Sequence, residues 1–385
     1  MPRAMDVILD RAHPSWDTLQ SQVLKCDGLV FPCEGSPWQA AINAGRANWV
    51  VFIDHRADVT IDDLHSLPQY LDVEDTPIWL QPVAASLAAD RRVGECCSEA
   101  VSLCWNNPAR YSLVCVRRSA ISSLPAIDDG HPEAIWDWLI KAAGRAQPGL
   151  PTTKTTIGDW HIPSTSSTAQ VSRPHRGHEP FVGPPENSIP KLTSQQPAPE
   201  LDWLIQHIES SKPSYFVPDT SQVSIADSVA VKAGLLLWHD AADASHQLSQ
   251  SIEGLGKRHA GDYWHAILHR REPDYSNAKY WFRQFHLHPV MSELIPYATR
   301  ALQDVSEGPT WKTRLLGKGS WDPLAFVDLC EACAGREESP LGVAARRIQA
   351  AEMQLLMAAT YLDASGCESN GTFGPLRIAP DVRLN

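Results

Sequence analysis

Short apolar runs alternate with amphipathic segments over the first 146 residues. Apolar and β-branched runs predict strands at residues 5–10, 28–32, 48–54, 77–82, 100–105 and 111–118. Apolar residues at helical spacing predict helices at about 15–24, 37–47, 60–71 and 132–144. The run NWVVFID at 48–54 is almost continuously apolar, as in strands that are buried on both faces of a parallel sheet. This alternation predicts an α/β domain over residues 1–146, with a mainly parallel sheet flanked by helices.

From about residue 200 the pattern changes, and apolar residues recur at helical spacing only. The segments that show this spacing are 229–254, 263–270, 277–284, 323–334 and 342–362. We therefore expect a mainly α-helical domain over residues 200–385.

Residues 147–199 lie between these two regions and follow neither pattern. The segment holds ten of the 30 prolines, many Ser and Thr residues, and almost no periodic apolar spacing. Such a composition buries too little apolar surface to offset the entropy lost on ordering. We interpret 147–199 as a linker between two domains.

The composition and the net charge of the chain bear on its expected partners and location. The chain has 385 residues, is 43% hydrophobic, and has a formal net charge of −12. Because nucleic acids and anionic membranes favour basic surfaces, we expect neither as the main partner. No apolar run reaches the roughly 18 residues of a membrane span, and no secretory signal begins the chain, so a cytoplasmic location is expected. In a cytoplasmic protein, the nine scattered cysteines are expected to be reduced thiols.

Several short motifs surround the strand at 48–54. Ala41, Asn43 and Gly45 form an Ala-x-Asn-x-Gly run before this strand, Asp54 ends it, and acids open the next helical segment. This order resembles family 2 glycosyltransferases with the GT-A fold, in which an Asp-x-Asp motif ends the corresponding strand. The resemblance covers roughly residues 5–146 and implies a GT-A-like domain that binds a nucleotide-sugar.

The resemblance also implies roles for individual residues. Asp54 would lie near the donor diphosphate or its Mn²⁺ or Mg²⁺ ion, with Asn43 and Arg56 among the substrate-binding residues. The second acid of the motif is absent, because the sequence reads Asp54-His55-Arg56. A guanidinium can replace part of a cation's charge, but it cannot ligate a metal. The segment 111–146 resembles the acceptor side of the family, where Glu133 is the candidate base. A non-catalytic scaffold that binds a sugar or a nucleotide is the alternative.

The helical region carries two polar seams. His239, Asp243 and His246 begin a stripe at steps of four and three that continues through Gln250 and Glu253. This stripe can be the solvated face of an amphipathic helix. However, residues 233–256 contain no lysine or arginine, and short polar side chains of this kind also suit a pocket or a metal site.

The second seam consists of His265, His269 and Glu272, at positions i, i+4 and i+7. A histidine pair at i, i+4 can bind one metal ion, although the sequence between the pair lacks the glutamate of the zincin proteases. Together the two seams offer His239, Asp243, His246, His265, His269 and Glu272 as ligands for a transition metal. A metal-dependent hydrolase with its site in the helical domain is therefore a further hypothesis.

Basic and aromatic side chains are interleaved around the second seam. The candidates for binding a phosphate or a sugar ring are Arg270, Arg271, Lys279, Trp264 and Tyr275. Such residues are typical of a surface for an anionic or sugar ligand. The same residues can instead form salt bridges and contacts between helices.

Overall fold

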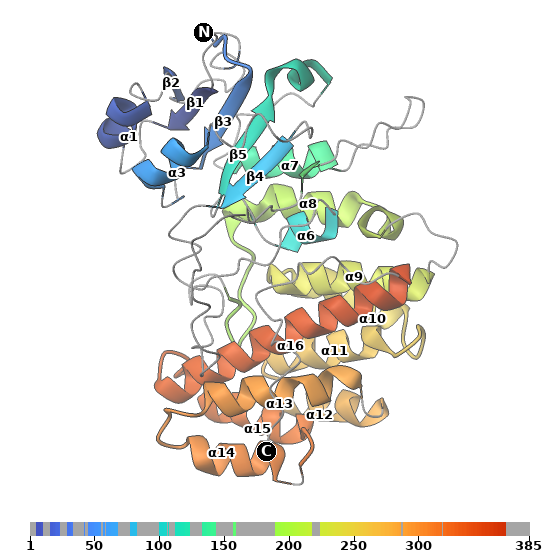
Figure 1. Cartoon of the computed structure of the whole chain (residues 1–385). Helices are drawn as coiled ribbons and strands as arrows, with labels where there is room; N and C mark the ends of the chain where they lie inside the picture. The colour runs from blue at the N-terminus through green and yellow to red at the C-terminus, as the bar shows by residue number, and fades with distance from the viewer. Residues whose placement is uncertain are drawn as a thin grey trace, which may run out of the picture. The chain divides into compact units, whose positions relative to one another are not determined.

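The computed structural model divides the chain into two compact units, Met1–Pro180 and Phe181–Asn385 (Figure 1). It describes residues 5–10, 16–23, 29–33, 42, 45–54, 57, 59–67, 78–82, 100–105, 107, 112–123, 133–143, 157–158, 189–217, 224–285, 288–317 and 319–366. Within these ranges, no helix combines the length and the apolar character that a membrane crossing requires.

The first unit is built on a mixed sheet. Its strands are β1 (Met5–Asp10), β2 (Leu29–Cys33), β3 (Trp49–Ile53), β4 (Ile78–Pro82), β5 (Ser112–Arg117) and β6 (Ile157–Gly158), in the order β2-β1-β3-β5-β4-β6. β5 runs antiparallel to both of its neighbours, whereas the other pairings are parallel. The α/β class is as expected. The direction of β5 was not predicted, because a buried apolar strand shows the same pattern in either direction.

The helices of this unit are α1 (Trp16–Val23), α3 (Ile61–Ser66), α6 (Ala100–Trp105), α7 (Ala134–Ala143) and the 3₁₀ helix η3 (Arg118–Ser123). Of these, α1, α3 and α7 lie where helices were predicted. α3 begins with a capping box, in which Thr60 and Asp63 bond each other's backbone N–H groups. The strand predicted at 100–105 is wrong, since this segment is the helix α6. Its buried residues Val101, Cys104 and Trp105 lie at i, i+3 and i+4, which is helical spacing.

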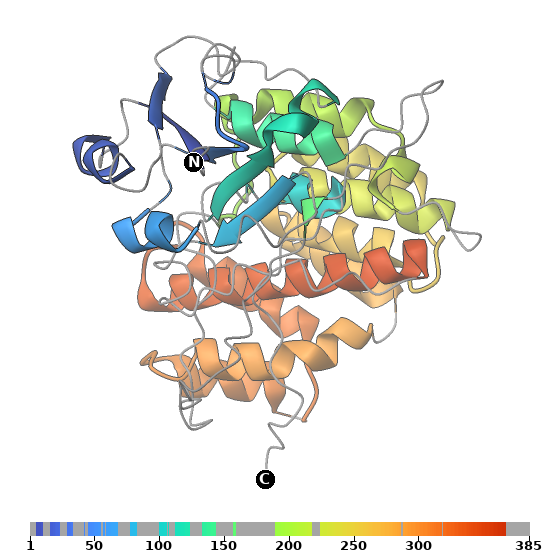
Figure 2. The ribbon, with the colours of Figure 1, turned by 45° about the horizontal axis from the view of Figure 1, so that its top comes forward.

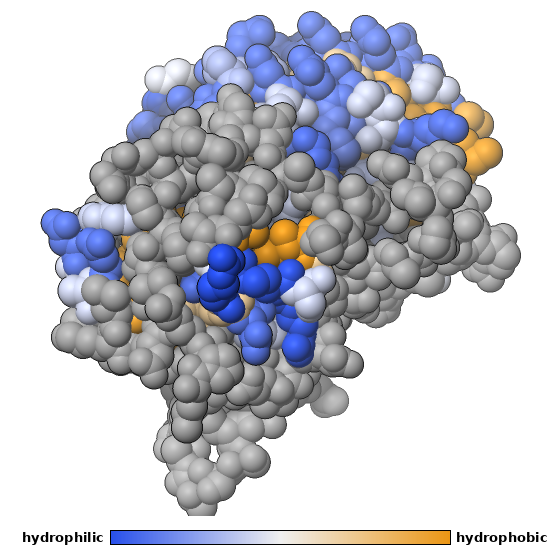
Figure 3. Space-filling view, turned by 90° about the horizontal axis from the view of Figure 1, so that it is seen from above, coloured by the Kyte–Doolittle hydropathy of each residue, from blue (hydrophilic) through white to orange (hydrophobic). Residues whose placement is uncertain are grey.

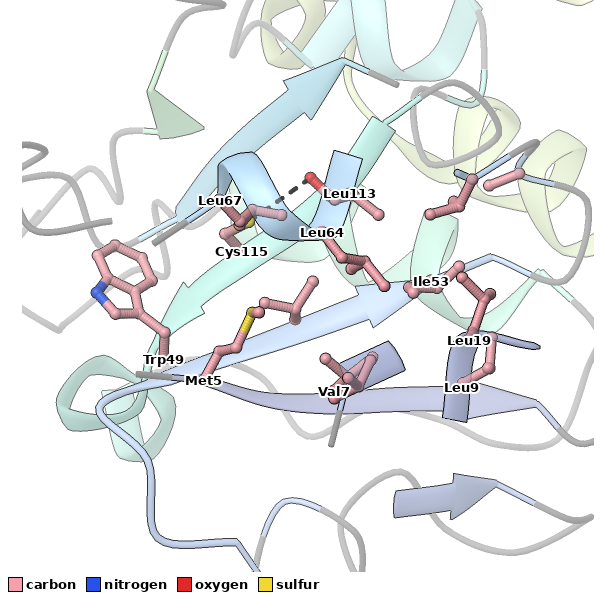
Figure 4. Packing of buried hydrophobic residues seen from close by; sticks show 14 residues of the cluster. Met5, Val7, Leu9, Leu19, Trp49, Ile53, Leu64, Leu67, Leu113 and Cys115 are labelled. Carbon is pink, nitrogen blue, oxygen red and sulfur yellow. Dashed lines mark hydrogen bonds between the residues drawn. The ribbon is translucent and has the colours of Figure 1, made fainter. Parts of the chain in front are cut away.

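One hydrophobic cluster of this unit lies on one face of the sheet. Alternate residues of β1 (Met5, Val7, Leu9) and of β3 (Trp49, Val51, Ile53) share that face with side chains of α1 and α3 (Figure 4). The intervening residues of β3 are buried on the opposite face, where the ring of Phe52 lies 5.8 Å from that of Trp138 in α7. β3 is thus buried on both faces, as its continuous apolar run predicts.

The second unit consists of helices. They are α8 (Asp202–Ser210), α9 (Ile225–Trp238), α10 (Ala242–Ser251), α11 (Ala260–Arg271), α12 (Tyr275–Gln284), α13 (Pro289–Ala301), α14 (Gly308–Leu316), α15 (Pro323–Cys333) and α16 (Pro340–Ser365), with the 3₁₀ helices η5 (Pro199–Leu201) and η6 (Pro213–Phe216). The long helix α16, red in Figure 2, packs against α9, α13 and α15. α11 packs against α9, α10 and α12. A mainly helical second unit agrees with the prediction.

One predicted helix is divided in two. The segment 229–254 was expected to be continuous, but α9 ends at Trp238 and α10 starts at Ala242. Asp240 between them has φ +64°, in the left-handed region that a continuing right-handed helix excludes. His239 therefore no longer shares a helical face with Asp243 and His246.

The last part of the predicted linker packs on the helical unit. The carboxylate of Glu337 accepts the backbone N–H groups of Leu192 and Thr193 at 3.0 and 3.1 Å. Gln349 donates to the carbonyl of Lys191 at 2.9 Å. The side chain of Leu192 is buried. Residues from 189 onward therefore belong to the helical unit.

One face of the molecule shows how polar and apolar side chains are distributed on it. In the view of Figure 3 most described side chains are hydrophilic, with a few hydrophobic areas among them. The large apolar side chains that are most exposed among the described residues are Ile225, Leu255 and Tyr280.

Candidate metal centre

Three histidines from two helices meet inside the helical unit. His265 and His269 lie one turn apart on α11, and His246 reaches them from α10. The ring centroids are 4.6 Å apart for His265 and His269, 4.7 Å for His246 and His265, and 5.4 Å for His246 and His269. One ring nitrogen from each can be chosen so that all three lie within 4.8 Å of one another. His246 of the first predicted seam therefore does face His265 and His269 of the second.

His265 is the most buried member of this histidine cluster. Its exposed fraction is 2%, against 7% for His269, and His246 is half-buried. In the described part of the chain, neither ring nitrogen of His265 has a hydrogen-bond partner. A neutral imidazole has one N–H donor and one lone pair, and buried groups of this kind are normally paired. Two unpaired nitrogens beside two other imidazoles indicate a position for a ligand.

The environment favours uncharged imidazoles. Burial, and to a lesser extent the neighbouring His269 and His246, lower the pKa of His265 to about 3. Burial also lowers the pKa of His269, although the carboxylate of Glu272 opposes this shift. Neutral imidazole is the form that binds a metal ion, so at neutral pH His265 does not have to release a proton before it binds one.

Other side chains surround the cluster. Oε2 of Glu272 lies 3.2 Å from Nδ1 of His269, and the amide nitrogen of Asn277 lies 3.2 Å from Nε2 of the same ring. The indole of Trp281 stacks on His265, with ring centroids 4.1 Å apart and an angle of 31° between the planes. Carboxylates beside metal-binding histidines commonly fix the ring and its tautomer. Glu272, predicted as a ligand, is placed to play this supporting role.

The donor set suits particular ions. Three imidazole nitrogens without a thiolate favour zinc, copper or nickel, whereas Mg²⁺ and Ca²⁺ prefer oxygen ligands. Tetrahedral zinc holds nitrogens at roughly 2.0–2.1 Å, which places neighbouring ligand atoms about 3.3 Å apart. The three nitrogens lie within 4.8 Å of one another, so any pair at that upper limit would have to approach by about 1.5 Å to bind one ion.

The other predicted metal ligands lie apart from the cluster. His239 is buried at the end of α9, before the break in the helix, and Asp243 is exposed in the first turn of α10. The only group of three or more metal-ligating side chains among the described residues is His246, His265 and His269. The continuous stripe predicted from His239 to Glu253 does not form, because Asp240 breaks the helix.

The predicted basic and aromatic patch is part of the core. Arg270 and Arg271 have fully buried side chains, the first paired with Glu352 and the second with Asp240 at 2.6 Å. Trp264 is also buried, and its indole N–H donates to Thr360 at 3.3 Å. These three residues hold helices together instead of presenting a surface to a ligand. Of the other two, Lys279 pairs with Asp328, and Tyr275 is half-buried.

The candidate residues of the first unit are only partly described. Asp54 follows the last residue of β3 and is 5% exposed. Glu133 is 2% exposed just before α7, and its carboxylate accepts a hydrogen bond from the amide of Asn107 at 3.0 Å. Asn43 and Arg56 lie outside the described residues.

Gly45 of the predicted motif has a packing role. A Cβ at this position would lie 2.3 Å from Oδ2 of Asp6 and 2.5 Å from Nη2 of Arg118. Asp6 also accepts the backbone N–H of Ala47 at 2.8 Å, and Arg118 donates to the carbonyl of Ala47 at 2.6 Å. The glycine therefore lets the chain before β3 approach a partly buried ion pair between Asp6 of β1 and Arg118, the residue after β5.

Sequence reasoning missed Asn277 and Trp281 as neighbours of the histidines. Both lie on α12, beyond the turn that follows α11, and their distance from the cluster depends on how the two helices pack. Comparison of the chain with models of protein families, with curated proteins and with solved structures found no significant match.

Proposed function

We propose that the helical unit binds a transition-metal ion through His246, His265 and His269. The observation that carries this proposal is the environment of His265. Its ring is buried beside two other imidazoles, and both of its nitrogens are unpaired among the described residues. A metal ion between the rings would use lone pairs that otherwise remain unsatisfied.

Metal-dependent hydrolysis is the catalytic activity that such a centre can support. An ion held by three side chains keeps a position for a further ligand. When this ligand is a carbonyl or phosphoryl oxygen of a substrate, the ion supplies Lewis acidity. What occupies the fourth position therefore decides between a hydrolytic centre and a structural one.

Metal analysis of the full-length protein tests the proposal. After removal of metals with a chelator and titration with Zn²⁺, we expect one tightly held ion per chain, measured by mass spectrometry of the dialysed protein. His246→Gln and His269→Gln should lose this ion. His288→Asn is the matched control, because His288 is also buried in the helical unit but lies outside the cluster. Equal zinc retention by the wild type and by His246→Gln would contradict the proposal, as would no retention by the wild type.

We propose a second function for the first unit, a divergent glycosyltransferase-like activity on a nucleotide-sugar. Its support is the position of Asp54, which is buried immediately after β3. Ligands of open α/β sheets bind beyond the carboxyl ends of parallel strands, and β3 is parallel to β1. Asp54 would contact the donor diphosphate or its Mn²⁺ or Mg²⁺ ion, and Glu133 would act as the base.

Thermal denaturation with a panel of nucleotide-sugars, with and without Mn²⁺, tests this second function. We expect one donor to raise the melting temperature of the wild type, and Asp54→Asn to reduce this rise. The matched control is Asp62→Asn, which changes an exposed acid of the same unit. If no donor stabilises the protein, the proposal fails. If a donor binds without transfer or hydrolysis, the unit is a binding scaffold.

A further inference from the structure

The side chain of Asn277 lies beside His269, one of the three histidines of the proposed metal site. Its side-chain nitrogen is 3.2 Å from Nε2 of His269. Neighbouring ligand atoms in a tetrahedral zinc site are about 3.3 Å apart, as calculated from zinc–nitrogen distances of roughly 2.0–2.1 Å. The amide of Asn277 and the ring of His269 therefore already have the spacing of two ligands of one ion.

The tautomer of His269 agrees with this arrangement. The carboxylate of Glu272 lies 3.2 Å from Nδ1 without hydrogen-bond geometry, and its negative charge favours a proton on that nitrogen. Nε2 then carries the lone pair, which the amide N–H of Asn277 can meet in the ion-free protein. The same lone pair is the one that a metal ion would take.

The amide group can exchange a donor for an acceptor without moving its backbone. Rotation of the terminal torsion by half a turn replaces the NH₂ group of Asn277 with its carbonyl oxygen. The backbone is held in the first turn of α12, where the N–H of Asn277 donates to the capping residue Asp274 at 3.2 Å. The side chain is half-buried, so its position is restricted by its surroundings.

We propose that the carbonyl oxygen of Asn277 is the fourth ligand, so that the ion has a closed tetrahedral shell. This inference rests on the proposed metal site. Three histidines and one amide oxygen would join α10, α11 and α12 around one ion. Structural zinc sites have four protein ligands, whereas catalytic sites keep one position for water or substrate. The centre is therefore a structural clamp while Asn277 is bound, and hydrolysis requires this side chain to leave.

Cobalt substitution with azide as a probe tests the closed shell. We load the full-length protein with Co²⁺ and record its visible spectrum during titration with azide, an anion that binds cobalt only at an open position. The wild-type spectrum should not change. Asn277→Ala should become responsive to azide, whereas Asn277→Asp, which keeps an oxygen ligand, should remain unresponsive.

Zinc affinity gives a second, independent measurement. We expect Asn277→Ala to weaken zinc binding by about 10- to 100-fold, the range seen when partners of metal ligands are removed. Asn277→Ser serves if the alanine variant does not fold. The matched control is Ser276→Ala, an exposed neighbour on α12, which should bind zinc as the wild type does.

The outcomes separate the two proposals. If wild-type protein binds cobalt but its spectrum responds to azide, Asn277 does not close the shell, and the open metal site remains. Unchanged azide response and zinc affinity in the Asn277 variants would also overturn the inference. If the wild type binds neither cobalt nor zinc, the metal site itself is refuted, and the inference fails with it.

Discussion

Helix α11 buries polar side chains toward two different sets of neighbours. Toward α16, Arg270 pairs with Glu352, which also accepts the hydroxyl of Tyr263 at 3.0 Å. The guanidinium of Arg270 also lies over the ring of Phe326, at 4.5 Å. Toward α10 and α12, His265 has no hydrogen-bond partner for either nitrogen among the described residues. The two sides differ in degree: Arg270 is held through one nitrogen, while its Nε and Nη1 lack partners among the described residues, whereas neither nitrogen of His265 is paired.

The largest effect is expected from breaking the paired side. Glu352→Ala leaves the charge of Arg270 buried without its partner, and we expect a loss of about 3–5 kcal/mol in the free energy of unfolding. Urea denaturation measures this loss. The double variant Arg270→Met, Glu352→Leu should recover part of it, because replacing both charges with apolar side chains removes the unpaired charge, although the buried hydroxyl of Tyr263 still loses its acceptor. A single variant as stable as the wild type would show that the pair contributes little.

The next largest effect on the free energy of unfolding is expected at low pH, from protonation of another buried imidazole, that of His288. Burial and the charge of Arg258 lower the pKa of His288 to about 4, while Asp363 opposes this shift. The pKa of His288 in the folded protein lies below its value of about 6.5 in the unfolded chain. The neutral imidazole therefore makes its full contribution to the free energy of unfolding above pH 6.5, and this contribution is lost as the pH falls toward 4. A shift of this size corresponds to roughly 3 kcal/mol.

His288→Asn isolates that contribution. Nδ1 of His288 accepts the N–H of Val290 at the start of α13, and asparagine is also a favourable N-cap. We expect the variant to lose less stability than the wild type between pH 6.5 and 4, as measured by urea denaturation at several pH values. Parallel pH profiles for the two proteins would contradict this expectation.

The unpaired side is tested by His265→Leu. Without metal, we expect the variant to be as stable as the wild type, or about 1 kcal/mol more stable, because an unpaired polar group is replaced by an apolar one. With zinc at 100 times the dissociation constant, the wild type should gain about 2.7 kcal/mol, and the variant should gain nothing. Thermal denaturation with and without zinc measures both effects. A large loss of metal-free stability would show that His265 has a structural role.

The smallest effect is expected at Lys279. Its ammonium group pairs with Asp328, but both side chains are partly exposed, at 25% and 33%. Exposed ion pairs contribute about 0–1 kcal/mol, so Lys279→Ala should reduce the free energy of unfolding by less than 1 kcal/mol in urea denaturation. A loss as large as that of Glu352→Ala would mean that exposure does not distinguish the two pairs.

Local spacing predicted part of this site correctly. His265 and His269 at i, i+4 lie on one helix, and Glu272 contacts His269. His246 also joins them, but the stripe to which it was assigned is divided at Asp240. The sequence pattern did not show this break, because residues 229–254 keep helical apolar spacing across it.

The role of the arginines was not visible from their neighbours in sequence. Arg270 and Arg271 follow two histidines and resemble the solvated end of a helix. Their partners, Glu352 and Asp240, are 82 and 31 positions away in the chain. A charged residue is buried only where folding brings such a partner to it. The residues next to an arginine in the sequence do not show whether this happens.

The sequence by itself determined the local structure: an α/β first unit, a helical second unit, a buried strand at β3 and two histidines on one face of α11. These features depend on the periodicity of apolar side chains along neighbouring residues. Only the tertiary structure decided that His246 and Asn277 lie beside those histidines and that Arg270 and Arg271 face inward. The physical reason is that pairing and burial depend on which helices pack together, and packing joins residues that are distant in the chain.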